Sequence, residues 1–210
     1  MPEPPPLAAH VDAVETPAGM LVLVHGFGHT ELHMAIAGRL IDPGRRFTLV
    51  APRGPIELRT RGAAAWVLPR RRHPEQFVAS VVQLAAMVDE QCERHGIDRT
   101  AVVLGGFSQG AIVALAVAAL PGRPVPAGVL LWCGTIPRDR GTEVDLGRLA
   151  GVPVLCEIAA RDEVIPPDVM RASAAELRAA GAAVTIEEHD ALHEVTLDML
   201  VGARAWLAAL

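Results

Sequence analysis

Short apolar runs recur along this chain, and their pattern is the strongest constraint on its fold. Residues 20–24 (MLVLV) contain no polar side chain, so a strand formed there would be buried on both faces. Strands of this kind are typical of parallel sheets covered by helices on both sides. Similar runs are found at residues 47–51, 101–104, 128–132, 152–158 and 184–187. The sequence therefore predicts a central sheet of six or more strands.

Segments with helical periodicity lie between these runs. The clearest helix is predicted to begin at Pro74, a residue favoured in the first turn, and to end before Gly96, which suits the position after a helix. Further helices are expected over residues 31–41, 110–120, 167–180 and 194–208. The alternation of strand and helix predicts a mostly parallel sheet with helices on both faces and no large lid domain.

Length and composition limit the remaining possibilities. The 210 residues suit one domain, expected over residues 20–210, with residues 1–19 as a proline-rich tail or edge segment. A net charge of −5 with no broad basic region argues against a nucleic-acid partner. The one basic cluster, Arg70–Arg72, would be either a solvated loop or an anion-binding site.

The start of the chain and its cysteines suggest a reducing compartment. No basic start with an apolar stretch marks a secretory signal, and no apolar run could cross a bilayer, so a cytoplasmic location is expected. The three cysteines, Cys92, Cys133 and Cys156, are odd in number and widely spaced. They are predicted to be buried thiols, because this spacing fits neither a disulfide framework nor a zinc site.

The most specific motif is G-x-S-x-G at residues 106–110, between a predicted strand and a predicted helix. A sharp strand-to-helix turn would raise the Ser108 hydroxyl above the edge of the sheet, at the positive end of the helix dipole. Gly106 and Gly110 remove the side chains that would collide in such a turn. Ser108 is thus the candidate nucleophile, and an ordinary turn serine is the alternative.

The strand, serine turn and helix together predict an α/β-hydrolase fold. In this fold a serine nucleophile takes its acid and then its base from later parts of the chain. The acidic candidate is Asp162, which follows the strand predicted at residues 152–158. Glu163 and Asp168 are the alternatives, as a solvated charge and as a residue of the next helix's first turn.

Two histidines compete for the role of base after the last predicted strand. His193 lies on a loop that could fold back over Ser108, whereas His189 belongs to the end of the strand. His193 is therefore the preferred base. His10 and His95 are expected to be exposed, and His73 belongs to the basic loop.

Residues 25–28 (HGFG) follow the first buried strand, where this fold supplies a main-chain N–H group to a developing oxyanion. The expected donors are the amides of Phe27 and Gln109, so conservative side-chain changes at these positions are expected to be mild. Trp66 follows a long irregular stretch and would either line an acyl pocket, as a substrate-binding residue, or pack in the core.

The spacing of His25, His29 and His33 at every fourth residue could place three metal ligands on one helix face. The intervening Gly26 and Gly28 argue against a continuous helix there. No metal site is expected, and acyl transfer through a serine requires neither a metal nor an organic cofactor.

With these motifs the chain resembles the phospholipase/carboxylesterase family, small α/β-hydrolases that include acyl-protein thioesterases and bacterial carboxylesterases. The resemblance implies a triad of Ser108, Asp162 and His193 and an oxyanion hole made by the Phe27 and Gln109 amides. The matching segments are residues 25–28, 51–55 with Trp66 downstream, 105–110, 162–166 and 193–195.

Three positions depart from the family pattern. Leu192 stands where the family has glycine before its histidine, Ala160 where glycine often precedes the acid loop, and Cys133-Gly134 where Ser-Gly is common. These changes leave the triad intact and affect the shape of the pocket.

The expected function is hydrolysis of carboxylic esters through an acyl-enzyme, with thioesters and lysophospholipids as further substrate classes. Two alternatives remain, a lactone- or dienelactone-type hydrolase or acyltransferase on the same fold, and a non-catalytic binding protein that has kept the fold. The partner would be a small ester or thioester, and monomer and homodimer are both open.

Overall fold

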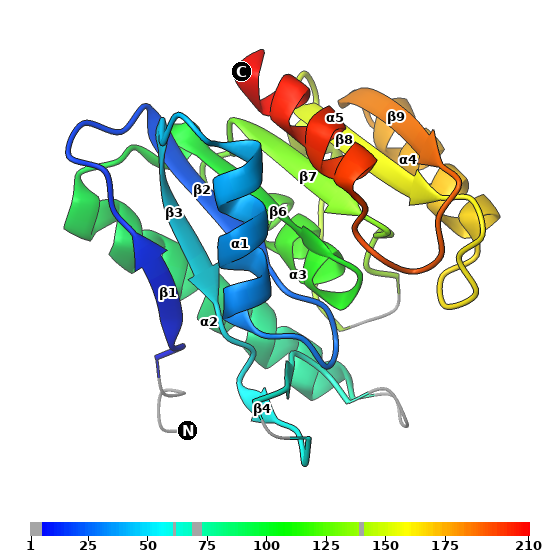
Figure 1. Ribbon diagram of the computed structural model, residues 1–210, viewed down its shortest axis with the longest axis horizontal. Helices are drawn as coiled ribbons and strands as arrows, with labels where there is room; N and C mark the ends of the chain where they lie inside the picture. The colour runs from blue at the N-terminus through cyan, green and yellow to red at the C-terminus, as the bar shows by residue number, and fades with distance from the viewer. Residues whose placement is uncertain (1–5, 61, 69–72, 139–140) are drawn as a thin grey trace.

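The computed structural model describes residues 6–60, 62–68, 73–138 and 141–210. Its centre is a seven-stranded sheet in the order β1-β3-β2-β6-β7-β8-β9, shown in Figure 1. The antiparallel strand is β1 (Ala9–Asp12), which pairs with β3 at one edge. The parallel strands are β2 (Gly19–Val24), β3 (Phe47–Pro52), β6 (Val102–Phe107), β7 (Gly128–Trp132), β8 (Pro153–Ala159) and β9 (Ala183–His189). This arrangement confirms the predicted mostly parallel sheet.

The inner strands are buried as their composition requires. Every residue of β2, β3, β6 and β7 is buried, whereas the edge strand β9 is mostly half-buried or exposed. A strand with helices on both sides has no face left for water, which explains the unbroken apolar runs. The buried Glu157 on β8 is therefore unusual, whereas polar residues on the edge strand β9 are not.

Helices cover both faces of the sheet, as predicted (Figure 1). Helices α1 (Glu31–Ile41) and α5 (Leu197–Ala208) lie on one face, and their buried residues share one apolar cluster. Helices α2 (Pro74–His95), α3 (Gln109–Ala118) and α4 (Pro167–Ala179) lie on the other and contribute to a second cluster. The described residues form no separate lid domain.

Local chemistry sets the ends of two helices. Helix α2 begins at Pro74 and ends before Gly96, whose φ of 62° is left-handed, so both predicted ends are confirmed. Helix α5 was expected from residue 194 but begins at Leu197. The reason is Thr196, whose hydroxyl accepts a hydrogen bond from the Met199 N–H and caps the first turn.

Several short elements were not indicated by the sequence. Strands β4 (Ile56–Glu57) and β5 (Ala64–Ala65) form a small antiparallel ribbon in the stretch expected to be irregular. Two 3₁₀ helices, η1 (Arg99–Ala101) and η2 (Leu146–Leu149), precede β6 and β8. The segment expected to be a tail or edge contains β1. Of the helices in the described residues, none combines the length and the apolar character needed to span a bilayer.

Candidate functional site

Ser108 lies at the tight turn between β6 and α3. Its φ of 53° and ψ of −118° are rare for a residue with a side chain, and its N–H donates to the carbonyl oxygen of Trp132 at 2.9 Å. A Cβ atom at Gly106 or Gly110 would collide with the carbonyl oxygen of Val24. The glycines therefore let the turn pack against β2, which holds the strained serine in place.

The structure brings Ser108, His193 and Asp162 into one hydrogen-bonded chain. The Ser108 hydroxyl lies 2.8 Å from His193 Nε2, and His193 Nδ1 lies 2.5 Å from Asp162 Oδ2. Ser108 is 8 % exposed and Asp162 is 5 % exposed, so the chain of hydrogen bonds is largely shielded from water. Such an arrangement can pass the serine proton to the imidazole while the carboxylate stabilises the resulting positive charge.

The loop after β8 holds Asp162 firmly. Its Oδ1 accepts hydrogen bonds from the N–H groups of Val164 and Ile165, both at 2.8 Å, which leaves Oδ2 for the imidazole. Glu163 and Asp168, the two alternatives from the sequence, are exposed to solvent. The geometry thus selects Asp162 as the carboxylate beside the histidine.

His193 reaches Ser108 from the loop between β9 and α5. His189 is the last residue of β9, and its Nε2 forms a hydrogen bond with the carboxylate of Glu157. Of the two histidines, only His193 contacts Ser108. The expected loop placement of His193 is observed, although the helix begins later than expected.

Phe107 packs against His193, a contact that the sequence did not indicate. Its ring centroid lies 4.9 Å from that of His193 and 5.4 Å from that of His29, and the side chain is buried. The ring also fills the space beside Gly26, where an added Cβ atom would lie 2.7 Å from the Phe107 ring.

Burial and the positive charges of neighbouring histidines lower the pKa of His29, which favours its neutral form.

The two main-chain N–H groups expected to stabilise an oxyanion are both available as donors. Neither the amide of Phe27 nor that of Gln109 has a hydrogen-bond partner among the described residues. The loop that carries Phe27 is fixed to β5, because Gly28 donates to Ala64 and Ala64 donates to His29, at 2.9 and 3.0 Å. Both amides could therefore stabilise an oxyanion.

The side chain of Gln109 has a role that the sequence analysis missed. Its carboxamide oxygen accepts from the N–H groups of Trp66 and Val67 at 2.8 and 3.2 Å, and its Nε2 donates to the Val67 carbonyl at 2.7 Å. The expectation that side-chain changes at Gln109 would be mild is therefore at odds with these contacts. No local motif signals them, because the partners are more than forty residues apart.

Trp66 is fully buried, so its side chain packs in the core and does not line an accessible pocket. Its indole N–H donates to the carbonyl of His25 at 3.0 Å. Both ring nitrogens of His25 are occupied, because Nδ1 donates to the Gly26 carbonyl and Nε2 accepts from the Gly54 N–H. Burial lowers the pKa of His25 to about 4, so this ring is neutral at pH 7.

The three cysteines are free and buried, as predicted. Cys133 lies beside Asp162 and His193, with a left-handed φ of 49°, and its thiol donates to the carbonyl of Glu194 at 3.7 Å. Burial, with a further contribution from the Asp162 charge, raises its pKa to about 12. The thiol is thus neutral and a poor nucleophile.

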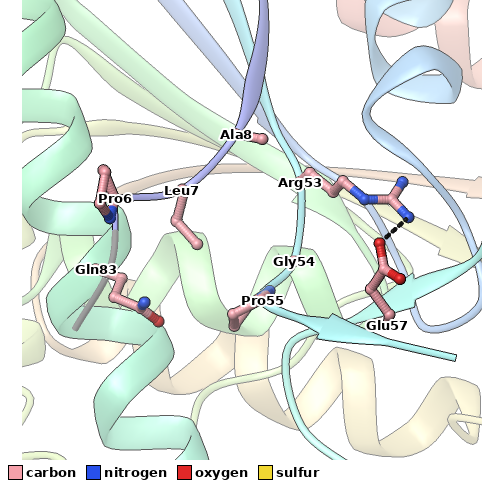
Figure 2. A pocket seen from close by; sticks show the side chains of 8 residues that line it. All are labelled: Pro6, Leu7, Ala8, Arg53, Gly54, Pro55, Glu57 and Gln83. Atoms are coloured by element: carbon pink, nitrogen blue, oxygen red, sulfur yellow. Dashed lines mark ion pairs between the residues drawn. The ribbon is translucent and has the colours of Figure 1, made fainter.

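The remaining features are the basic cluster, a hollow and the possible metal-ligating groups. The Arg70–Arg72 cluster is outside the described residues. A hollow of about 210 Å³, drawn in Figure 2, has a lining that includes none of Ser108, Asp162 and His193. Among the described residues, two groups place three metal-ligating side chains together, and neither contains His25, His29 or His33. The first group is Cys133, Asp162 and His193, and the second is Glu157, Glu187 and His189.

Comparison with known proteins identifies the family of this chain. The model of the phospholipase/carboxylesterase family matches residues 8–210. The putative hydrolase MhqD of Bacillus subtilis is 27 % identical over 198 residues, which cover 94 % of this chain and 96 % of that protein.

Two solved structures share the fold. A carboxylesterase from Mesorhizobium loti superposes with a TM-score of 0.82 at 24 % identity and covers 97 % of this chain and 95 % of its own. Acyl-protein thioesterase 2 of Zea mays gives a TM-score of 0.72 at 19 % identity, with 96 % and 98 % covered. The protein is an ester hydrolase with the α/β-hydrolase fold, and the chain belongs to the phospholipase/carboxylesterase family.

Proposed function

We propose that this protein cleaves carboxylic esters through a Ser-His-Asp triad and a covalent acyl-enzyme. The observation that carries the proposal is the hydrogen-bonded chain from Ser108 Oγ through His193 to Asp162, at a turn where the serine is held in a strained conformation. A nucleophile, a base in contact with it and a group that orients the base are the minimum set for acyl transfer.

In the first half of the reaction, His193 Nε2 takes the Ser108 proton as the oxygen attacks the carbonyl carbon of the substrate. The negative charge that develops on the carbonyl oxygen is stabilised by the N–H groups of Phe27 and Gln109. The C–O bond to the alcohol then breaks, and the protonated imidazole transfers its proton to the leaving oxygen.

In the second half, water enters and His193 removes one of its protons while the oxygen attacks the acyl-enzyme. Collapse of this intermediate releases the carboxylic acid and returns the proton to Ser108. Asp162 accepts the Nδ1–H of His193 throughout, which keeps Nε2 free to accept a proton and stabilises the imidazolium.

The same triad and N–H donors can act on thioesters, since only the leaving group changes. Lysophospholipids are also acyl esters, so the same steps apply to them. We therefore include both classes in the proposed substrate range. A panel with acyl chains from acetyl to palmitoyl, each as ester and thioester, would rank them by kcat/KM.

The decisive experiment combines labelling by a fluorophosphonate with turnover of short-chain p-nitrophenyl esters. The wild-type protein should react with the probe at Ser108 and hydrolyse the esters, and Ser108→Ala should lose both while retaining its fold by circular dichroism. Ser173→Ala, which removes a buried hydroxyl on α4, serves as the matched control and should keep both. A wild-type protein that neither labels nor turns over esters would instead be a non-catalytic binding protein.

A further inference from the structure

Three ionisable side chains outside the proposed triad converge between the sheet and α5. Glu157 is on β8, and Glu187 and His189 are on β9. The strand register places Glu157 opposite Glu187 and Ala159 opposite His189. Side chains two residues apart on a strand lie on the same face, so all three point toward α5. Figure 1 shows α5 crossing these strands.

The carboxylate of Glu157 is incompletely paired. Its side chain is 0 % exposed, and Oε2 accepts a hydrogen bond from His189 Nε2. Its other oxygen, Oε1, is buried and has no hydrogen-bond partner among the described residues. Leaving such an oxygen without a partner is costly, so a native structure that keeps one calls for an explanation.

Acidic side chains outnumber basic ones in this cluster. In the described part of the chain, no arginine forms an ion pair with Glu157 or Glu187. The two carboxyl groups therefore lack a compensating positive charge other than the one His189 could carry.

A glycine on α5 leaves room at the centre of the cluster. A Cβ atom at Gly202 would collide with Glu187 Oε2 and lie 3.0 Å from Glu157 Oε1. Glycine inside a helix is less favourable than alanine, so its presence here needs a local reason. The absence of a side chain at Gly202 is what allows both carboxylates to occupy this space.

We propose that Glu157, Glu187 and His189 form a binding site for a divalent transition-metal cation of the Zn²⁺ type. Their ligand atoms lie within 4.8 Å of one another. Carboxylate oxygens and an imidazole nitrogen bind Zn²⁺ at roughly 2.0–2.2 Å, and small side-chain rotations would bring the three atoms to that distance from a common centre. The cation supplies a partner for Glu157 Oε1 and displaces the proton shared by His189 and Glu157 into solvent. It would approach along the edge strand β9, where His189 is 14 % exposed.

The position of this site connects it with the loops of the triad. Asp162 follows Glu157 by five residues and His193 follows His189 by four. The main chain ties the two strand ends together, because the Ala160 N–H donates to the His189 carbonyl at 2.8 Å. A cation that bridges β8 and β9 would therefore stabilise the sheet edge from which both loops extend.

Cation binding can be tested on the full-length protein after dialysis against a chelator. Titration with Zn²⁺ by calorimetry should show one site per chain, and Zn²⁺ should raise the thermal midpoint. Glu157→Gln and His189→Gln should each weaken binding at least about tenfold, since each removes one ligand. Gly202→Ala should weaken it too, because the methyl group would fill the space between the carboxylates.

Controls separate this site from its neighbours. Glu188→Gln removes the adjacent acid, which lies on the opposite face of β9 and pairs with Arg171, and it should bind Zn²⁺ as the wild type does. Cys133→Ala tests the other group of possible ligands and should also bind normally. The near-ultraviolet spectrum of the Co²⁺-loaded protein should lack a thiolate charge-transfer band.

Three outcomes would overturn the proposal. The first is the absence of binding of Zn²⁺ or Co²⁺ at millimolar concentration, which would leave a hydrogen-bonded carboxyl–imidazole cluster only. The second is an unchanged affinity in both Glu157→Gln and His189→Gln. The third is a thiolate band that disappears in Cys133→Ala, which would place the cation beside the triad instead.

Discussion

The side chain of Gln109 and the main chain of Val67 are joined by two hydrogen bonds of opposite direction. Gln109 Nε2 donates to the Val67 carbonyl at 2.7 Å, and the Val67 N–H donates to Gln109 Oε1 at 3.2 Å. The residue after the proposed nucleophile thus holds the segment after β5, and this segment buries Trp66 against His25. A contact of this kind couples the turn at Ser108 to the loop that carries Phe27.

Gln109→Ala should therefore lower both stability and activity. The substitution leaves buried main-chain groups of Trp66 and Val67 without partners, which costs about 1–3 kcal/mol. The rate constant kcat for p-nitrophenyl butyrate should fall more than KM changes. The reason is that the side-chain hydrogen bonds that hold Gln109, and with it the Gln109 N–H, in position are lost. Urea unfolding and steady-state kinetics measure the two effects. Gln91→Ala is the matched control, since Gln91 is also buried but its Oε1 has no partner in the described part of the chain, and it should keep wild-type kcat.

Asp162→Asn should abolish most of the activity without unfolding the protein. The amide oxygen can still accept from Val164 and Ile165, whereas the amide NH₂ group would face His193 Nδ1 and favour the tautomer with the proton on Nε2. That tautomer cannot accept the Ser108 proton, and a loss on the order of 10⁴-fold in kcat is expected.

The control for this change is Glu163→Gln, which neutralises the neighbouring exposed carboxylate. Its kcat/KM should stay near the wild-type value. If Glu163→Gln lost activity and Asp162→Asn kept it, the assignment of the acid would be wrong.

The buried imidazole of His25 predicts a loss of stability in mild acid. The folded protein binds a proton there only below about pH 4, whereas the unfolded chain binds one below about pH 6.5. Between these values the unfolded state holds more protons, so the free energy of unfolding decreases as pH falls from about 6.5 to about 4. The difference of about 2.5 pKa units corresponds to roughly 3 kcal/mol at most.

Urea unfolding of the wild type and of His25→Gln at pH 7 and pH 5 isolates this contribution, because other titrating groups are common to both proteins. The variant should be less stable at pH 7 and should lose less stability on acidification. Equal losses in the two proteins would show that His25 does not titrate in this range.

The cysteines should resist alkylation in the folded protein. All three are buried, and burial raises the pKa of Cys133 and of Cys156 to about 12, so almost no thiolate is present at pH 8. Iodoacetamide should leave the native mass and the esterase activity unchanged, and the same treatment in guanidinium chloride should label Cys92, Cys133 and Cys156. Rapid native labelling of Cys133 with loss of activity would contradict the structure.

Prediction from sequence succeeded where the signal is local. The apolar runs predicted all six parallel strands, and in β2, β6 and β7 the reason is that burial on both faces excludes polar side chains. Pro74 and Gly96 predicted the ends of α2 because their backbone preferences belong to those positions. The start of α5 was wrong by three residues, because the apolar periodicity extends through a loop that ends only at the Thr196 cap.

Prediction stopped at contacts between segments distant in the sequence. Trp66 could have lined a pocket or packed in the core, and its burial depends on Gln109 and His25. Phe107 was passed over, although it lies beside the serine, because its packing on His193 depends on where the loop after β9 folds back.

The sequence by itself determined the order of strands and helices, the glycine-flanked turn at Ser108 and which later segments offer an acid and a base, since each follows from the preferences of neighbouring residues. Only the tertiary structure decided that His193 and not His189 meets Ser108, and that His189 joins Glu157 and Glu187 beneath α5. The physical reason is that these contacts depend on strand register and helix packing between segments far apart in the sequence. The residues of one strand do not reveal which strand it pairs with, nor the register of that pairing.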